Sequence, residues 1–282
     1  MNVKNKTLAQ WKKLFAQELA HLYEKREIES IFELVFESFG WSKVDFLLNL
    51  NTEITKEEEA LNSILTALKN EEPIQYILGY AHFDDLVIPV KTGVLIPRQE
   101  TEELVDWVDN SLPKGSSILD VCTGSGCISL ALKNRDKTKA ISAIEYSTDA
   151  LKQVKENIDK LELNVEVYKM DALANWDLKQ TWDCIVSNPP YIPESDKVRM
   201  KNNVLEFEPN MALFVDDDNP LIFYRRIAEE GMIHLKNGGL LFFEIHEDLG
   251  EETKALIEKI GYKQVELRKD LNGKDRMIKA IR

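Results

Sequence analysis

The segment Ile118–Leu132 constrains the fold of this chain more than any other stretch. An apolar run, Ile118–Val121, leads into a turn that contains Gly124 and Gly126, and the turn opens a helical pattern. Glycine lets the backbone approach a ligand closely, and a helix start offers N–H groups that have no partner within the helix. The combination is typical of the βα turn of nucleotide-binding proteins, although the full glycine spacing of the dinucleotide fingerprint is absent.

Strand-like apolar runs and helical patterns alternate from Ser116 to the end of the chain. Ala150–Leu161, for example, has an apolar face at helical spacing. The strand-like runs are 118–121, 141–145, 165–168, 184–187, 240–245, 264–268 and 276–281. This alternation predicts an α/β fold with a mainly parallel sheet of seven strands, covered by helices on both faces.

Four polar residues fall at or just after strand ends. They are Asp120, Glu145, Asp171 and Asn188. Ligands in such folds bind at the carboxyl ends of the strands, so we expect these side chains on one rim of a binding site. Glu145 is suited to accept both hydroxyls of a ribose, and Asp171–Ala172 is where we expect an adenine ring. A helix cap is the alternative role for Asp171.

The strand that ends at Ser187 runs into Asn188-Pro189-Pro190-Tyr191. Each proline restricts the residue before it and lacks a backbone donor, so the strand tip is stiff. The Asn188 carbonyl and a backbone carbonyl near Pro189 are placed to accept two N–H groups of a planar polar group, and Tyr191 is placed to cover its face. In isolation this motif would indicate only a strand that ends in a loop.

Together with the glycine turn and Glu145, this motif resembles the S-adenosylmethionine-dependent methyltransferases of the Rossmann-like class that methylate planar nitrogens. Within that class the chain is similar to the release factor glutamine methyltransferases along nearly its whole length. The segments that carry the resemblance are Glu72–Gly79, Leu95–Glu102, Phe207–Leu213 and Asp270–Arg276. The sequence departs from the family at Cys122, where a glycine is usual, at Glu145, where Asp is common, and at His82–Asp85.

The resemblance implies a class I methyltransferase fold with a small N-terminal helical bundle, and S-adenosylmethionine as cofactor. The implied substrate is the side-chain amide N5 of the glutamine in the Gly-Gly-Gln motif of class I peptide chain release factors. The implied cofactor-binding residues are Asp120, Cys122, Thr123, Gly124, Ser125, Gly126, Glu145, Asp171, Ala172 and Asn188. The implied substrate-binding residues are Asn188, Pro189, Pro190, Tyr191 and Arg98, of which Asn188, Pro189 and Tyr191 are catalytic. Arg98 orders its segment against the cofactor or an acidic neighbour, or forms a plain surface salt bridge.

We expect the chain to divide into three regions, the last of which is the methyltransferase domain. Residues 1–75 are expected to form the helical domain, with a C-terminal stop at Gly40 and a capping box at Thr55 and Glu58. Residues 76–96 are expected to form a connector with a hairpin made by 86–88 and 94–96, and the methyltransferase domain, 97–282, is expected to open with a helix at Pro97. The helical domain either stabilises the enzyme or recognises its partner, and the resemblance favours recognition.

Charge and cysteine content limit the function classes. The chain of 282 residues has a formal net charge of −13. Duplex DNA binding rests on neutralising phosphates, so an acidic chain is poorly suited to it. The three cysteines have no C-x-x-C spacing and the four histidines are dispersed, so we expect neither a disulfide framework nor a metal site. No signal peptide is visible, and apolar runs such as 240–243 are far too short to span a bilayer, so we expect a cytoplasmic protein without a membrane segment. We also expect it to act as a monomer.

An amide nitrogen is a poor nucleophile because its lone pair is delocalised. Our hypothesis is that Asn188 and the Pro189 carbonyl each accept one N–H of the substrate amide, which aims the nitrogen at the methyl group. Alternatives remain: a glutamine of a ribosomal protein or adenine N6 as the acceptor, a nicotinamide-dependent oxidoreductase, or a non-catalytic binding module. The oxidoreductase reading leaves Asn188–Tyr191 without a role.

Overall fold

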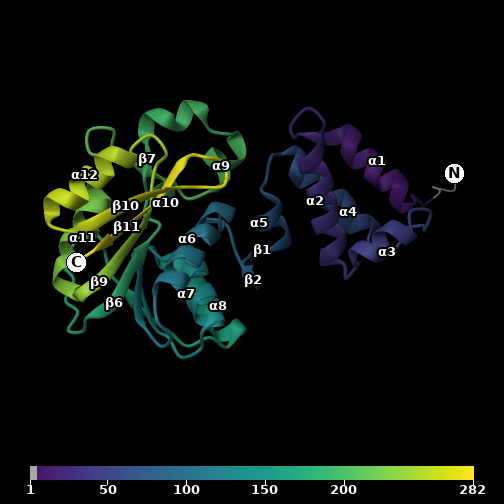
Figure 1. The fold of residues 1–282 in the computed structure, drawn as a ribbon. Helices are drawn as coiled ribbons and strands as arrows, with labels where there is room; N and C mark the ends of the chain where they lie inside the picture. The colour runs from purple at the N-terminus through teal and green to yellow at the C-terminus, as the bar shows by residue number, and fades with distance from the viewer. Residues whose placement is uncertain (1–4) are drawn as a thin grey trace. The chain divides into compact units, whose positions relative to one another are not determined.

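The computed structural model describes residues 5–282 of the chain, which divide into two compact units (Figure 1). The first comprises the described residues up to Gly79 together with Asn202–Phe207, and the second comprises Tyr80–Lys201 and Glu208–Arg282. Each unit has its own hydrophobic core. No helix within residues 5–282 is both long enough and apolar enough to cross a membrane.

The first unit is helical apart from an isolated β-bridge between Thr7 and Glu53. Its helices are α1 (Leu8–Leu19), α2 (Lys25–Ser38), α3 (Lys43–Leu48), α4 (Glu58–Lys69), α5 (Ile74–Leu78) and α9 (Asn202–Phe207). Aromatic side chains fill the core, and the Phe15 and Phe32 rings meet edge to face with centroids 5.0 Å apart. Gly40 follows α2 with a φ of +85°, in the left-handed conformation that ends many helices.

The capping box expected at Thr55 is wrong. Helix α4 begins at Glu58, its N-cap is Glu57, and no described side chain caps it. Glu58 and Glu59 instead place negative charge in the first turn, where the helix dipole favours it.

The second unit opens with a hairpin of β1 (Tyr80–Phe83) and β2 (Leu86–Pro89). The expected pairing of 86–88 with 94–96 is wrong, because Phe83 pairs with Leu86 across a two-residue turn. Asp84 takes a φ of +52° in that turn, as the tight hairpin turns require. The following helix, α6 (Gln99–Ser111), begins two residues after Pro97.

A seven-stranded sheet forms the centre of the second unit, and the predicted fold class is confirmed. The strand order is β10-β11-β9-β6-β3-β4-β5. The parallel strands are β3 (Ser117–Val121), β4 (Ala140–Glu145), β5 (Val165–Lys169), β6 (Trp182–Ser187) and β9 (Leu235–Glu244). At one edge β10 (Lys263–Lys269) and β11 (Asp275–Ile281) run antiparallel to their neighbours.

Helices cover both faces of this sheet (Figure 1). Helix α6 lies with α7 (Cys127–Arg135) and α8 (Thr148–Leu161) on one face, and α11 (Ile222–His234) and α12 (Gly250–Ile260) lie on the other. After β6 the chain forms β7 (Ile192–Pro193), a 3₁₀ helix over Glu194–Arg199, α10 (Asn210–Leu213) and β8 (Phe214–Val215). Both faces are apolar because every central strand is buried on two sides.

Candidate active site

The strand order reverses beside β3, and this reversal creates the site. The chain runs from β3 outward to β4 and β5 and then returns to place β6 on the other side of β3. Val121 is in register with Ser187 of β6 and with Ile144 of β4. The glycine turn after β3, the end of β4 and the loop after β6 therefore meet at one edge, where ligands bind in folds of this kind.

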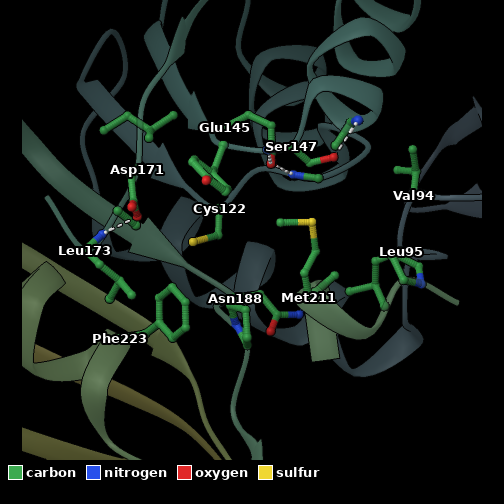
Figure 2. A pocket seen from close by; sticks show the side chains of 18 of the residues that line it. Val94, Leu95, Cys122, Glu145, Ser147, Asp171, Leu173, Asn188, Met211 and Phe223 are labelled. Carbon is green, nitrogen blue, oxygen red and sulfur yellow. Dashed lines mark hydrogen bonds between the residues drawn. The ribbon is translucent and has the colours of Figure 1, made fainter. Parts of the chain in front are cut away.

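A pocket of about 350 Å³ lies at this edge (Figure 2). Its walls come from the ends of β3, β4 and β5, the loop after β6, residues 93–95 and the region of α10. Glu145 and Ser147 lie on one side of it, and Asn188 and Met211 lie on the opposite side. The size suits a small-molecule ligand.

Glu145 ends β4 and points its carboxylate into the pocket region (Figure 2). One oxygen accepts from the Gly124 amide at 2.8 Å and the other from the Ser147 amide at 2.7 Å. Burial raises the pKa of Glu145, while these two backbone donors and that of Tyr146 lower it. Each carboxylate oxygen can accept a second hydrogen bond, so the group is fixed in place and still able to bind two hydroxyls.

The turn after β3 exposes its backbone to the pocket. A Cβ built on Gly124 would meet nothing within 4 Å, so a ligand can approach the main chain there. Cys122 adopts a φ of +63°, the left-handed conformation that favours glycine, and also lines the pocket. The backbone at residue 122 therefore has the conformation that a glycine would favour, although the residue is a cysteine. Burial holds the pKa of the Cys122 thiol well above its usual range, so the thiol stays protonated.

Asp120 supports this turn from behind. Its Oδ2 accepts from the Thr123 hydroxyl at 2.6 Å and from the Ser129 hydroxyl at 2.7 Å, and burial raises its pKa to about 6. Its Oδ1 finds no hydrogen-bond partner among residues 5–282. A buried acceptor without a partner is costly unless a ligand satisfies it.

The structure separates the implied cofactor residues into two groups. Those that line the pocket are Cys122, Gly124, Glu145, Asp171, Ala172 and Asn188. Asp120, Thr123, Ser125 and Gly126 lie outside its wall and shape the turn. The Ser125 carbonyl accepts from Asn157 at 2.8 Å. Gly126 has a φ of +85° and lies so near Val154 that a Cβ would come within 2.6 Å of it.

Asp171 lies at the pocket after β5, where its Oδ1 accepts from the Leu173 amide at 2.8 Å (Figure 2). A carboxylate that bonds the backbone two residues on forms an Asx turn, and no described helix starts at this point. The helix-cap alternative for Asp171 is therefore wrong.

The loop after β6 brings Asn188 and Pro190 to the pocket wall, with Pro189 and Tyr191 beside it. Asn188 Nδ2 donates to the Thr101 hydroxyl at 3.2 Å, and the Tyr191 hydroxyl donates to Glu244 at 3.0 Å. Burial and the nearby Glu244 raise the pKa of Tyr191 well above its usual range, so the phenol is neutral. Both side chains are therefore held at their polar ends.

Of the roles considered for Arg98, the structure shows the contact with an acidic neighbour, Glu208. Its guanidinium bonds Glu208 at 2.5 Å, and the other oxygen of that carboxylate accepts from the Ile96 amide at 3.3 Å. The Glu208 side chain is buried while Arg98 is about one-third exposed. This pair attaches residues 96–98 to the segment that leads into Pro209, which lines the pocket.

Sequence reasoning missed Thr101, Glu208 and Glu244. The signal for Glu244 was present, since it ends an apolar strand just as Glu145 does. The roles of Thr101 and Glu208 depend on hydrogen-bond partners that lie at least 87 residues away in the sequence.

Comparisons with known proteins agree with this geometry. The PrmC N-terminal domain family matches residues 10–79, and the Methyltransferase small domain family matches residues 99–207. A release factor glutamine methyltransferase of Flavobacterium psychrophilum is 41% identical over 273 residues, which are 94% of this chain and 96% of that protein. One of Bacteroides thetaiotaomicron is 38% identical over 269 residues, 94% of this chain and 97% of that protein.

Among solved structures, a methyltransferase from Pyrococcus furiosus is similar in fold, with 19% identity and a TM-score of 0.50 over 70% of this chain and 88% of that one. The sequence relatives extend over almost the full length, so they cover both units. The chain is therefore a methyltransferase and belongs to the family of release factor glutamine methyltransferases.

Proposed function

We propose that this protein transfers the methyl group of S-adenosylmethionine to the side-chain amide N5 of the glutamine in the Gly-Gly-Gln motif of class I peptide chain release factors. The observation that carries the proposal is the position of Asn188. Its side chain lies at the wall of the pocket, at the point where the strand order reverses, on a loop stiffened by two prolines.

The residues of the pocket fit the cofactor. Glu145 would hold the ribose hydroxyls, Asp171 the adenine amino group, and the apolar side chains of Ile144 and Leu173 would contact the adenine ring. Asp120, which accepts from the hydroxyls of Thr123 and Ser129 behind the turn, would hold the glycine turn in place against the cofactor. When bound, the cofactor supplies an electrophilic methyl group on a sulfonium.

The remaining task of the protein is alignment. Asn188 Oδ1 and the Pro189 carbonyl would each accept one N–H of the substrate amide, which fixes the plane of the amide and stabilises the positive charge that develops on nitrogen. Tyr191 would cover the face of the amide. Holding two reactants in a reactive orientation lowers a barrier by up to roughly 7–11 kcal/mol, which suits a nucleophile that no strong base activates.

A protein substrate in the cytoplasm is the partner that we propose, with the enzyme acting as a monomer and without direct contact to nucleic acid. The names of the relatives support the release factor, and the net charge of −13 disfavours a polyanion. The helical first unit, which contains none of the proposed reacting residues, would supply the surface that recognises the partner.

Mass spectrometry of purified release factor, incubated with this protein and S-adenosylmethionine, tests the proposal. We expect one added methyl group on the Gly-Gly-Gln glutamine and none with the Asn188→Ala variant, which should still bind the cofactor. Modification of a ribosomal protein or a nucleic acid in place of the release factor would overturn the substrate assignment. An Asn188→Ala rate within a few-fold of wild type would overturn the mechanism.

A further inference from the structure

Glu244 is a buried carboxylate outside the pocket wall that connects to two residues of the reacting centre. It is the last residue of β9 and is 1% exposed. Its Oε2 accepts from the Thr101 hydroxyl of α6 at 2.6 Å, and its Oε1 accepts from the Tyr191 hydroxyl at 3.0 Å. Thr101 is itself buried and in turn contacts Asn188.

The number of available hydrogens decides which group donates in each hydrogen bond between Glu244, Thr101 and Asn188. Thr101 has a single hydroxyl hydrogen, and the 2.6 Å hydrogen bond in which this hydroxyl donates to Oε2 of Glu244 uses it. Toward Asn188, Thr101 can then act only as an acceptor. Asn188 must therefore present its NH₂ group to Thr101, which the 3.2 Å contact from Nδ2 reflects, and its carbonyl oxygen is left for another donor.

The opposite orientation of the Asn188 amide would disable the proposed reaction. An NH₂ group aimed at the substrate would meet the N–H donors of the glutamine amide, and two donors repel. The two orientations of an amide have nearly the same shape, so packing alone discriminates weakly between them. A hydrogen bond of fixed polarity discriminates strongly.

We infer that Glu244 is a positioning residue that acts through Thr101 to fix the carbonyl of Asn188 toward the substrate amide, and that holds Tyr191 in place by the same carboxylate. This inference rests on the proposed function, since it assigns how that site is kept in its reactive arrangement. Neither Glu244 nor Thr101 touches the reacting atoms in this scheme.

The groups around Glu244 act on its pKa in opposite directions, and the net shift is upward. Burial raises its pKa, whereas the hydroxyls of Thr101 and Tyr191 and the charge of Arg276 lower it, and Glu100 raises it slightly. Arg276 is held by two further carboxylates, Asp270 at 3.1 Å and Glu247 at 3.2 Å.

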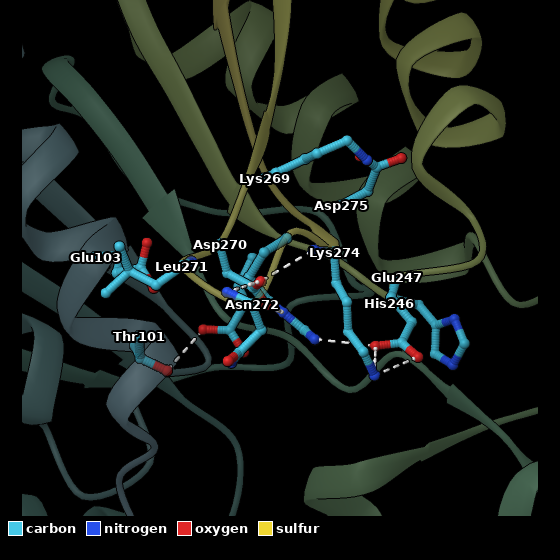
Figure 3. Close-up of polar contacts among 12 residues, drawn as sticks. Thr101, Glu103, His246, Glu247, Lys269, Asp270, Leu271, Asn272, Lys274 and Asp275 are labelled. Carbon is cyan, nitrogen blue, oxygen red and sulfur yellow. Dashed lines mark hydrogen bonds and ion pairs between the residues drawn. The ribbon is translucent and has the colours of Figure 1, made fainter.

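Figure 3 shows the hydroxyl of Thr101 in its hydrogen bond, with the Asp270–Lys274 hairpin tip and Glu247 nearby. The hairpin tip also contacts α6 directly, because the Leu271 amide donates to Glu103 at 3.1 Å. The helix that carries Thr101 is thus attached to the sheet at two points. These attachments keep the Thr101 hydroxyl at hydrogen-bond distance from Glu244.

The test compares substitutions that keep the shape of the side chain and remove one hydrogen-bonding property. Thr101→Val deletes the hydroxyl, and Thr101→Ser keeps it. Glu244→Gln leaves one acceptor oxygen where the carboxylate has two, so the side chain can no longer accept from both the Thr101 and the Tyr191 hydroxyl. Thr253→Val is the matched control, because Thr253 is also buried and its hydroxyl donates to the backbone carbonyl of Leu249, the residue before its own helix α12.

We expect Thr101→Val and Glu244→Gln to lower kcat by about 100-fold, the loss that a misplacement of about 1 Å produces. The dissociation constant for S-adenosylmethionine and the KM for release factor should stay within about threefold of wild type. Thr101→Ser should restore kcat to within about threefold, and Thr253→Val should leave it unchanged. Calorimetric titration gives the cofactor affinity, and thermal melting shows that each variant is folded.

Two results would overturn the inference. The first is a kcat within about threefold of wild type for Thr101→Val. This result refutes the inference even if Glu244→Gln does not fold. The second is a Thr101→Ser variant as inactive as Thr101→Val, which would show that the methyl group and not the hydroxyl is needed. A wild-type enzyme that does not methylate the release factor is a different outcome, because it refutes the proposed function before any variant is compared.

Discussion

Replacing Glu145 with glutamine is the most direct perturbation of the cofactor site. The carboxylate is held by two backbone donors, Gly124 at 2.8 Å and Ser147 at 2.7 Å, and retains acceptor capacity for two ribose hydroxyls. A glutamine amide has one oxygen and one nitrogen, so one backbone N–H would face an NH₂ group. The side chain must then rotate away or give up an acceptor, and in either case at least one bond to the ribose is lost.

A hydrogen bond to a charged group contributes about 1.5–3 kcal/mol. Since about 1.4 kcal/mol corresponds to a tenfold change, losing one such bond should raise the dissociation constant for S-adenosylmethionine by about 10- to 150-fold. Isothermal titration calorimetry at pH 7.5 measures the change directly. Glu166→Gln is the matched control, because Glu166 lies exposed on the adjacent strand β5 and outside this pocket.

A dissociation constant for Glu145→Gln within about threefold of wild type, in a protein that melts normally, would refute the assignment of Glu145 to the ribose. An equal loss of affinity in Glu166→Gln would refute it as well, because the effect would then come from net charge near the sheet and not from the bonds of this carboxylate.

Three further predictions concern the glycine turn. Gly126→Ala should lower the free energy of unfolding by about 2–4 kcal/mol in urea titrations, because the residue has a φ of +85° and the added Cβ would lie 2.6 Å from Val154; a loss below about 0.5 kcal/mol would contradict this. Cys122→Val should cost more than about 1 kcal/mol by the same measurement, whereas Cys122→Gly should stay within about 1 kcal/mol of wild type, because a β-branched side chain tolerates a φ of +63° poorly; equal effects would count against strain at this residue. Burial raises the pKa of Asp120 from 3.8 to about 6, so the folded state binds this proton more tightly than the unfolded state, and stability is lost as the pH rises. Relative to Asp120→Asn, the wild type should therefore lose about 1 kcal/mol between pH 5 and pH 7, and parallel pH profiles of the two proteins would refute the shift.

The sequence by itself determined the fold class and the location of the site. Alternating strand and helix patterns predict a parallel sheet, because only strands buried on both faces read as continuous apolar runs. Polar residues at strand ends identified the rim, and Glu145 and Asn188 do line the pocket. These features are local, since each depends on a few neighbouring residues and on the period of the apolar pattern.

The boundaries of some local elements did not follow from the sequence. Thr55 offered a capping box that the chain does not use, and the segment 94–96 looked like a hairpin strand, whereas its residues Val94 and Leu95 line the pocket. Helix α4 begins at Glu58 with Glu57 as its N-cap, and residues 86–89 pair with 80–83, so neither local pattern predicted the element that forms. The two-residue turn at Asp84 fixes which strands pair, and neither strand alone carries that information.

Only the tertiary structure decided how the reactive residues are held. Glu244 meets Thr101 across 143 positions of sequence, and Arg98 meets Glu208 across 110. No period or spacing relates such residues, because the sheet order and the crossing of α6 over it bring them together. A hydrogen bond depends on distance and angle within a few tenths of an ångström. The sequence therefore predicted the residues that line the pocket at the strand ends, whereas the contacts of Thr101, Glu208 and Glu244 followed only from the fold.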